Sequence, residues 1–192
     1  ISTKDKEVIC SHNFDLEKET IGKGYITDLD YSSLNPIIAE HNICFKGQEI
    51  LPKVLDVFKM LNSNIKVNIE VKSSFALDFR TARALSKILK KLPTKRILIS
   101  SFNPFVILFF KIFHRQIVTG FLFQNIEYMW FVNWIHPSYI HPRADLLNDD
   151  LLIYAKAKNL GINVWTVNND QAIDWCKGME VDGIITDLGV IK

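Results

Sequence analysis

Short apolar runs separated by polar turns recur along the chain and alternate with segments of helical spacing. Two of those segments, 77–92 and 148–161, place apolar residues three and four apart, as amphipathic helices do. The first stops before Pro93, and the second has Asn148 as a suitable N-cap and Gly161 as a suitable stop. Seven runs rich in Ile and Val have the length of strands: 8–12, 66–72, 96–101, 117–123, 138–141, 162–168 and 182–186. The alternation predicts βαβ units and a parallel sheet.

Seven strands fit an α/β protein with a TIM (β/α)8 barrel that lacks its first βα unit in this chain. A closed barrel has eight strands and typically about 250 residues, whereas the sequence has 192. An open, doubly wound sheet is the alternative, because the pattern alone does not separate the two. We find no repeat and no flexible linker, so we expect one domain over residues 1–192, with residues 13–47 as an excursion above the barrel.

Composition narrows the class of protein. The chain is 48% hydrophobic and 23% charged, as globular proteins are, and its net charge of +2 gives no support for a nucleic-acid partner. Three widely spaced cysteines, Cys10, Cys44 and Cys176, indicate buried thiols in a reducing compartment, which favours the cytoplasm. A zinc site at His41 and Cys44 would lack a second pair of ligands.

The most apolar run covers residues 104–113. It is shorter than the about 20 residues that a membrane-spanning helix needs. Two interpretations stay open for it: a buried helix, or a surface that touches a membrane.

Two charged residues end the predicted strand 66–72. Asn68, Glu70 and Lys72 share one face of that strand, because alternate residues point to opposite sides. Inside a barrel a carboxylate and an ammonium group both need partners. Glu70 and Lys72 either pair with each other, or Glu70 binds a hard cation while Lys72 meets a phosphate.

Two further side chains stand at predicted strand ends. His12 ends the run 8–12, at the edge where barrel active sites lie, and imidazole can exchange a proton with an alcohol near neutral pH. Trp165 is either a core residue or the wall of a pocket for an alkyl or glycerol group. His136 and His141 are interpreted as loop residues because a proline follows each.

Six stretches together carry a family resemblance. They are SHNFDLEKETIGKGYITDLDYSSL at 11–34, QEILPKVLDVF at 48–58, NIEVK at 68–72, SSFNP at 100–104, NVWTVNND at 163–170 and VDGIITDLG at 181–189. In this order they resemble the motifs of the glycerophosphodiester phosphodiesterase family. Any one of them alone is weak, but the set is specific and runs from about Lys4 to Gly189.

The resemblance implies a TIM barrel that hydrolyses a glycerophosphodiester substrate to glycerol 3-phosphate and an alcohol, with a divalent cation, Ca or Mg. It places His12 on one of the family's two acid/base histidines and Glu70 on one of its three metal carboxylates. Lys72 falls on the lysine near the phosphate. Trp165 falls on the tryptophan of the glycerol-sized pocket, and Asn168 is expected to tie down the loop that follows it.

The sequence also departs from the family. The His-Arg-Gly and Glu-x-Asp motifs, which would supply the other histidine and two carboxylates, do not stand before His12. The chain as it stands is therefore expected to be inactive. Asn13 replaces the family's aspartate, and Lys18 replaces an arginine, which loses bidentate geometry. Two alternatives remain: a phosphodiesterase of the same fold acting on lysophospholipids or sphingolipids, with peripheral membrane contact through 105–113, or a non-catalytic barrel that only binds.

Overall fold

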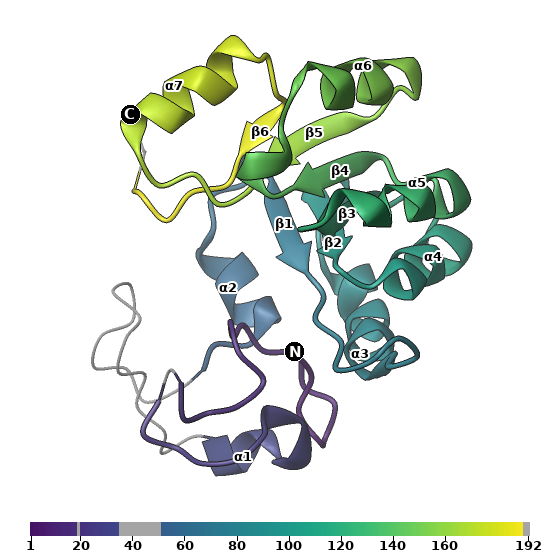
Figure 1. Cartoon of the computed structure of the whole chain (residues 1–192). Helices are drawn as coiled ribbons and strands as arrows, with labels where there is room; N and C mark the ends of the chain where they lie inside the picture. The colour runs from purple at the N-terminus through teal and green to yellow at the C-terminus, as the bar shows by residue number, and fades with distance from the viewer. Residues whose placement is uncertain (19, 35–50, 190–192) are drawn as a thin grey trace. The chain divides into compact units, whose positions relative to one another are not determined.

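The computed structural model describes residues 1–18, 20–34 and 51–189 (Figure 1). The chain forms two compact units: unit 1 comprises residues 1–67 and 71–96, and unit 2 comprises residues 68–70 and 97–192. One domain with an excursion over 13–47 stays a prediction. Residues 35–47 of that excursion, with His41 and Cys44, lie outside the described residues.

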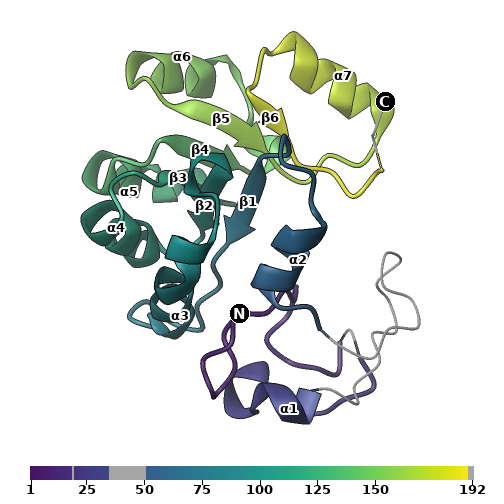
Figure 2. The same cartoon turned by 180° about the vertical axis from the view of Figure 1, so that it is seen from behind.

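Among the residues that the structure describes, six strands form one sheet in the order of the sequence. They are β1 (Val67–Glu70), β2 (Ile97–Ser101), β3 (Val118–Phe123), β4 (Tyr139–Pro142), β5 (Gly161–Val164) and β6 (Gly183–Ile184). Neighbouring strands from β2 to β6 pair in parallel (Figures 1 and 2). A doubly wound sheet reverses its strand order at a switch point. The sequential order excludes that alternative and confirms the expected barrel topology.

The strand expected over 8–12 does not form, so that prediction is wrong. Val8 and Ile9 make only isolated antiparallel bridges, to Ser2 and Lys53. The chain turns back at Lys6, which has a φ of 70°, and the Ile9 amide then donates to the Ile1 carbonyl over 2.9 Å. A local antiparallel turn thus uses the backbone groups that a parallel ladder would have needed.

Four α-helices belong to the described part of unit 2. They are α4 (Pro104–Phe113), α5 (Met129–Ile135), α6 (Asp149–Ala157) and α7 (Asp170–Gly178), with single 3-10 turns η4 (Ile126–Tyr128) and η5 (Ala144–Leu146). Asn148 caps α6 as predicted, its side chain accepting from the Leu151 amide over 2.9 Å. Gly161 is not the helix stop, however. The helix ends at Ala157, Asn159 takes the left-handed conformation with a φ of 53°, and Gly161 begins β5.

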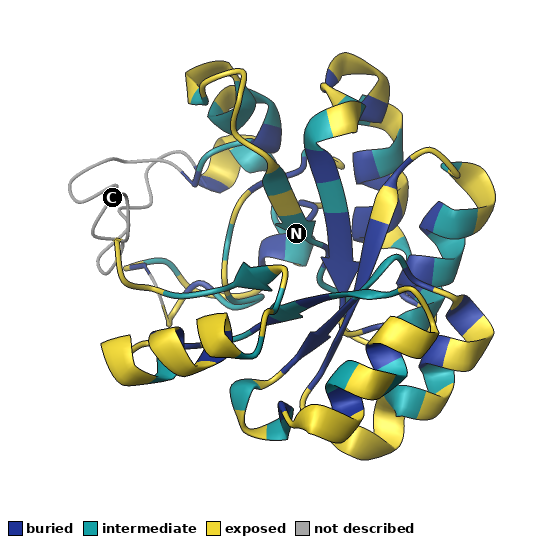
Figure 3. Cartoon of the chain, turned by 90° about the horizontal axis from the view of Figure 1, so that it is seen from above, coloured by how far each residue is buried: buried dark blue, intermediate teal, exposed yellow. Residues whose placement is uncertain are grey.

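One face of the sheet packs against these helices. Alternate strand residues Phe121, Phe123, Ile140, Ile162 and Val164 join Ile107, Val132, Ile135, Leu151 and Ala155 in a buried cluster. Figure 3 shows the strands largely buried and the outer faces of the helices exposed. The other strand residues, including Gly120, His141 and Asn163, point to the opposite face.

The other helical elements of the described ranges belong to unit 1. They are η1 (Ile26–Asp28), α1 (Tyr31–Leu34), α2 (Val54–Met60), α3 (Arg80–Ile88), η2 (Leu89–Lys91) and η3 (Thr94–Arg96). Helix α3 with η2 confirms the helix predicted over 77–92. None of the helices in the described ranges is long and apolar enough to cross a membrane.

The described part of the excursion has its own small core. The Leu16 amide donates to the Gly24 carbonyl (3.0 Å), and the Ile26 amide donates to the Phe14 carbonyl (2.9 Å). Gly24 adopts a φ of +93° at this turn, a conformation that glycine favours. The buried core cluster of this part of the chain consists of Ile1, Ile9, Leu16, Ile26, Leu34 and Leu51.

Candidate active site

The four predicted site residues fall in different units. His12 and Lys72 belong to unit 1, and Glu70 and Trp165 belong to unit 2. Each is therefore described within its own unit. Their catalytic, substrate-binding and metal-binding roles stay predictions.

Trp165 directly follows β5 and is held by two neighbouring segments. Its indole Nε1 donates to the backbone carbonyl of His141 on β4 over 2.7 Å. Phe102, in the loop after β2, packs edge-on against the indole with ring centroids 5.2 Å apart. The only polar atom of the side chain is thus already bonded within the protein. A ligand here would meet an apolar ring, as expected of a pocket wall.

His141 is a strand residue, so its interpretation as a loop residue is wrong. It lies on β4 and is fully buried, whereas His136 is exposed and follows α5. The Asn163 amide nitrogen lies 3.0 Å from His141 Nε2. Since an amide nitrogen donates, Nε2 accepts, and the neutral ring carries its proton on Nδ1. Nδ1 is buried and has no hydrogen-bond partner in the described part of the chain.

Burial also sets the charge of this histidine. Desolvation lowers the pKa of His141 to about 4, from an ordinary value of 6.5. The ring is therefore neutral near pH 7. The backbone carbonyl of His141 accepts the hydrogen bond from the Trp165 indole. The buried residue His141 therefore supports the apolar wall that Trp165 forms.

Three glycines make room for large side chains on the same face. A Cβ atom at Gly120 would lie 2.4 Å from Nε2 of the His141 ring. A Cβ at Gly161 would lie 2.1 Å from the Tyr139 ring, and one at Gly183 would lie 2.4 Å from Asn163 Oδ1. These three side chains of β4 and β5 thus each cover a glycine on a neighbouring strand.

Asn168 ties two segments of the sheet edge together. Its Oδ1 accepts from Thr186 Oγ1 (3.2 Å) and from the Asp187 amide (2.9 Å), and its Nδ2 donates to Asp187 Oδ2 (2.7 Å). These bonds hold the segment after β6 rather than the loop after Asn168. The next residue, Asn169, caps α7 by accepting from the Ala172 amide over 2.8 Å.

The charged candidates lie near the end of β1 and at the end of the run 8–12. Strand β1 ends at Glu70, which is half-buried, and the half-buried Lys72 follows it. His12 is exposed. Among the described residues no three His, Cys, Asp or Glu side chains gather into a metal-binding group. Glu70 is therefore at most one ligand of a cation, and hard cations need several oxygen ligands.

Asp78 is a buried carboxylate after β1 that the sequence did not single out. Arg80 donates to both of its oxygens over 2.9 Å, and the Ser74 amide adds a third bond over 3.1 Å. The Arg80 hydrogen bonds hold the pKa of Asp78 at about 2, below its ordinary 3.8. Asp78 is thus engaged in fixing the entry to α3. Lys18, which stands at the family's arginine, pairs with Asp15 over 3.3 Å.

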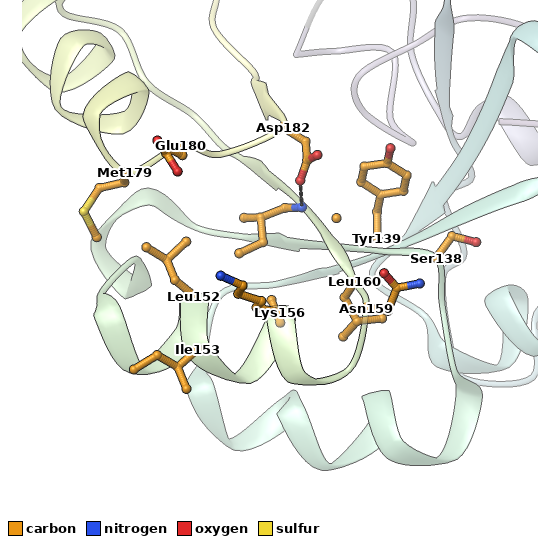
Figure 4. Close-up of a pocket in the computed structure, with 13 residues that line it drawn as sticks. Ser138, Tyr139, Leu152, Ile153, Lys156, Asn159, Leu160, Met179, Glu180 and Asp182 are labelled. Atoms are coloured by element: carbon orange, nitrogen blue, oxygen red, sulfur yellow. Dashed lines mark hydrogen bonds between the residues drawn. The ribbon is translucent and has the colours of Figure 1, made fainter.

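A cavity of about 710 Å³ lies at the opposite edge of the sheet in unit 2 (Figure 4). Its lining includes Ser138 before β4, Gly161 at the start of β5 and Asp182 before β6. These are the amino ends of the strands, whereas barrel active sites lie at the carboxyl ends. One oxygen of Asp182 already accepts from the Ile162 amide over 2.8 Å. We therefore assign no catalysis to this cavity.

Known proteins match nearly the whole chain. Residues 2–188 match the model of the glycerophosphoryl diester phosphodiesterase family. A glycerophosphodiester phosphodiesterase from Caldanaerobacter subterraneus subsp. tengcongensis is 27% identical over 191 residues, which cover 96% of this chain and 78% of the relative.

Solved structures show the same fold. A phosphodiesterase from Oleispira antarctica, in complex with the product sn-glycerol-3-phosphate, has a TM-score of 0.84 and 20% identity, and the match covers 97% of this chain and 78% of that one. A glycerophosphodiester phosphodiesterase from Parabacteroides distasonis has a TM-score of 0.80 and 23% identity, with coverage of 98% and 77%. These matches confirm a partial TIM barrel. The chain belongs to the glycerophosphoryl diester phosphodiesterase family, a family of phosphoric diester hydrolases.

Proposed function

We propose that this protein hydrolyses glycerophosphodiesters to glycerol 3-phosphate and an alcohol, and that it uses a divalent cation, Ca or Mg. The observation that carries the substrate class is Trp165, which two contacts fix at the carboxyl edge of the sheet with only its ring free for a ligand. An apolar wall of this size suits the carbon face of a glycerol group. The Oleispira relative binds sn-glycerol-3-phosphate as its product, which fits this proposal.

Each named side chain has a chemical task in this proposal. The imidazole of His12 exchanges a proton with a substrate hydroxyl. The ammonium group of Lys72 offsets negative charge on the phosphate. Trp165 orients the glycerol group, and Asn168 holds the adjoining segment by its bonds to Thr186 and Asp187.

The cation is the part of the proposal that the described residues do not complete. They hold no cluster of three ligating side chains. Glu70 is proposed as one ligand because it ends β1 at the edge where barrel active sites lie. The cysteines are the basis for proposing a cytoplasmic location. Of the two cysteines that the structure describes, Cys176 is buried as predicted, whereas Cys10 is exposed, so the prediction of a buried thiol is wrong there.

The test is hydrolysis of glycerophosphocholine by the full-length protein with Mg or Ca and with EDTA. We expect Glu70→Gln to abolish metal-dependent hydrolysis while the circular dichroism spectrum and the unfolding midpoint stay unchanged. The control is Glu180→Gln, an exposed carboxylate of the same type. Full activity of the Glu70 variant without added metal would instead show that Glu70 only partners Lys72.

A second substrate class is favoured by one observation. Trp130 and Trp134 on α5 are exposed, and such rings suit a lipid surface. A lysophospholipid or sphingolipid is therefore the alternative substrate. Comparing rates on glycerophosphocholine and on lysophosphatidylcholine separates the two. Of the run 105–113 proposed for membrane contact, Val106, Ile107 and Phe110 are buried and cannot take part.

A further inference from the structure

Helix α5 carries no charged residue, although it lies on the protein surface. Its seven residues, Met129–Ile135, include two exposed tryptophans. Trp130 is 60% exposed and Trp134 is 47% exposed. By contrast, α6 and α7 of the same unit each carry both acidic and basic residues. A surface helix without charge is unusual, since such helices normally present a polar face to solvent.

Helix α4 is apolar on its outer side as well as its inner side. Val106, Ile107 and Phe110 are buried. Phe105, Phe109 and Phe113 are spaced four residues apart, so they share one face of the helix. Phe113 at the end of that face is 67% exposed.

The two helices join into one aromatic surface. Phe105 of α4 packs edge-on against Trp134 of α5 with ring centroids 5.6 Å apart. On α5, Trp134 contacts Phe131 at 6.5 Å, and Phe131 stacks on Trp130 at 3.9 Å. Phe109 contacts Phe113 at 5.0 Å. We define the aromatic surface as Phe105, Phe109, Phe113, Trp130, Phe131 and Trp134; Figures 1 and 2 show α4 and α5 side by side.

The charges around this surface match a phospholipid headgroup layer. Lys111 and Arg115 flank the exposed pair Ile112 and Phe113 at the end of α4. From Phe102 to Ile135 the sequence holds only these two cations and one anion, Glu127. Cations beside protruding apolar side chains can meet lipid phosphates while the rings enter the interface.

The position and the size of the aromatic surface also suit a phospholipid layer as the partner. Phe102, in the loop that leads into α4, contacts Trp165, so the chain that carries the aromatic surface begins beside the proposed substrate wall. Six rings are few compared with the about 20–30 residues per side of a stable protein–protein interface. A shallow patch of Trp and Phe is instead typical of proteins that rest on a membrane interface.

We infer that the aromatic surface of α4 and α5 binds the interface of phospholipid bilayers, with the tryptophan rings at headgroup depth. This binding does not depend on the proposed hydrolysis. Because the segment 102–135 supplies just two cations, Lys111 and Arg115, we expect binding to rest mainly on the rings and to change little with salt.

The experiment is sedimentation of the full-length protein with phosphatidylcholine vesicles at low and high salt. The test variant is Trp130→Gln with Trp134→Gln. The control is Trp175→Gln on α7, which removes a tryptophan of the same 47% exposure as Trp134. We expect the double variant to lose about tenfold or more in vesicle affinity, because burying one large aromatic side chain is worth at least that factor. The control should bind as the unchanged protein does.

Three results would overturn the inference: no binding of the unchanged protein to vesicles, equal loss in the Trp175 control, or a dimer in solution that the double variant turns into a monomer. The last would identify a second copy of the chain as the partner. Glycerophosphocholine hydrolysis is measured on the same samples. If hydrolysis is absent while vesicle binding responds as expected, the proposed function fails and the membrane inference stands.

Discussion

At the residue scale, the bonds of Trp165 decide what it can offer a substrate. The hydrogen bond from Nε1 to the His141 carbonyl fixes the ring and removes its only donor. Specificity at this wall therefore comes from shape and apolar contact rather than from a hydrogen bond to a substrate hydroxyl.

Replacing Trp165 separates the hydrogen bond from the ring. Trp165→Phe keeps an apolar ring but leaves the His141 carbonyl without its donor, so we expect a loss of about 1 kcal/mol in the free energy of unfolding. Trp165→Ala also removes the wall, and its KM for glycerophosphocholine should rise well above that of the Phe variant. Urea unfolding and steady-state kinetics measure the two effects. Equal KM values for both variants would show that the ring does not touch substrate.

His141 predicts a dependence of stability on pH. Its pKa is about 4 in the folded protein and 6.5 ordinarily, so between these values the unfolded chain binds a proton that the folded chain does not. Stability is therefore full above pH 6.5 and falls as the pH drops towards 4, by up to about 3 kcal/mol. Urea unfolding between pH 4 and 7 should show this fall of the free energy of unfolding with decreasing pH in the wild-type protein and in His136→Gln. The slope should be smaller in His141→Gln, and an identical slope there would refute the assignment.

At the element scale, three helices of unit 2 begin with the same device. Asn103, Asn148 and Asn169 each place a side-chain oxygen on a backbone amide of α4, α6 or α7, over 2.9, 2.9 and 2.8 Å. These bonds satisfy amides that have no partner within their helix. Of these three caps, the sequence analysis predicted the one at Asn148.

Removing a cap tests its contribution to the fold. We expect Asn148→Ala and Asn169→Ala each to lower the free energy of unfolding by about 1 kcal/mol, because each leaves a helix amide without its acceptor. Asn148→Ser and Asn169→Ser, which keep an oxygen at the cap, should lose much less. Thermal unfolding of the four variants measures this, and equal losses for Ala and Ser would rule out capping as the cause.

Replacing Gly120 tests how closely β3 and β4 approach each other. Gly120→Ala would place a Cβ 2.4 Å from the buried His141 ring, so the strands or the ring must shift. We expect a loss of about 1–3 kcal/mol, as for other overpacked cores. Gly178→Ala is the control, since a Cβ there meets nothing within 4 Å. Calorimetric unfolding compares the two, and a neutral Gly120 variant would show that the ring moves freely.

The sequence predicted the elements better than the contacts between them. Periodicity found the strands that became β1 to β6 and the helix over 77–92. It failed over residues 8–12, where a turn at Lys6 pairs Ile9 with Ile1. It also missed His141, although the run 138–141 predicted its strand. The pairing of that residue with Asn163 joins positions 22 apart in sequence, and spacing along one strand does not reveal such a contact.

At the scale of the whole molecule, the proposed cation needs oxygen ligands in addition to Glu70. The described residues form two units and bring no three ligating side chains together. Glu70 and Lys72, two positions apart, fall in different units. The stability of the whole protein with and without cation is therefore more informative than either unit alone.

Cation binding predicts a thermal shift. A ligand at about one hundred times its Kd stabilises the folded state by about 2.7 kcal/mol. For a protein of this size that raises Tm by about 5–10 °C. We expect Ca or Mg to give this rise in the full-length protein, EDTA to reverse it, and Glu70→Gln to abolish it. A shift that persists in the variant would place the cation away from Glu70.

The three glycine contacts on the face of the sheet that carries His141 also bear on how the family varies. Each glycine faces one large partner: Gly120 with His141, Gly161 with Tyr139, and Gly183 with Asn163. A larger residue at any of the three glycine positions can be inherited only together with a smaller partner, so these sites should change as pairs. In an alignment of relatives, position 120 should depart from glycine mainly where position 141 is small. Evolution along this face would then proceed by coupled exchanges, with single replacements selected against.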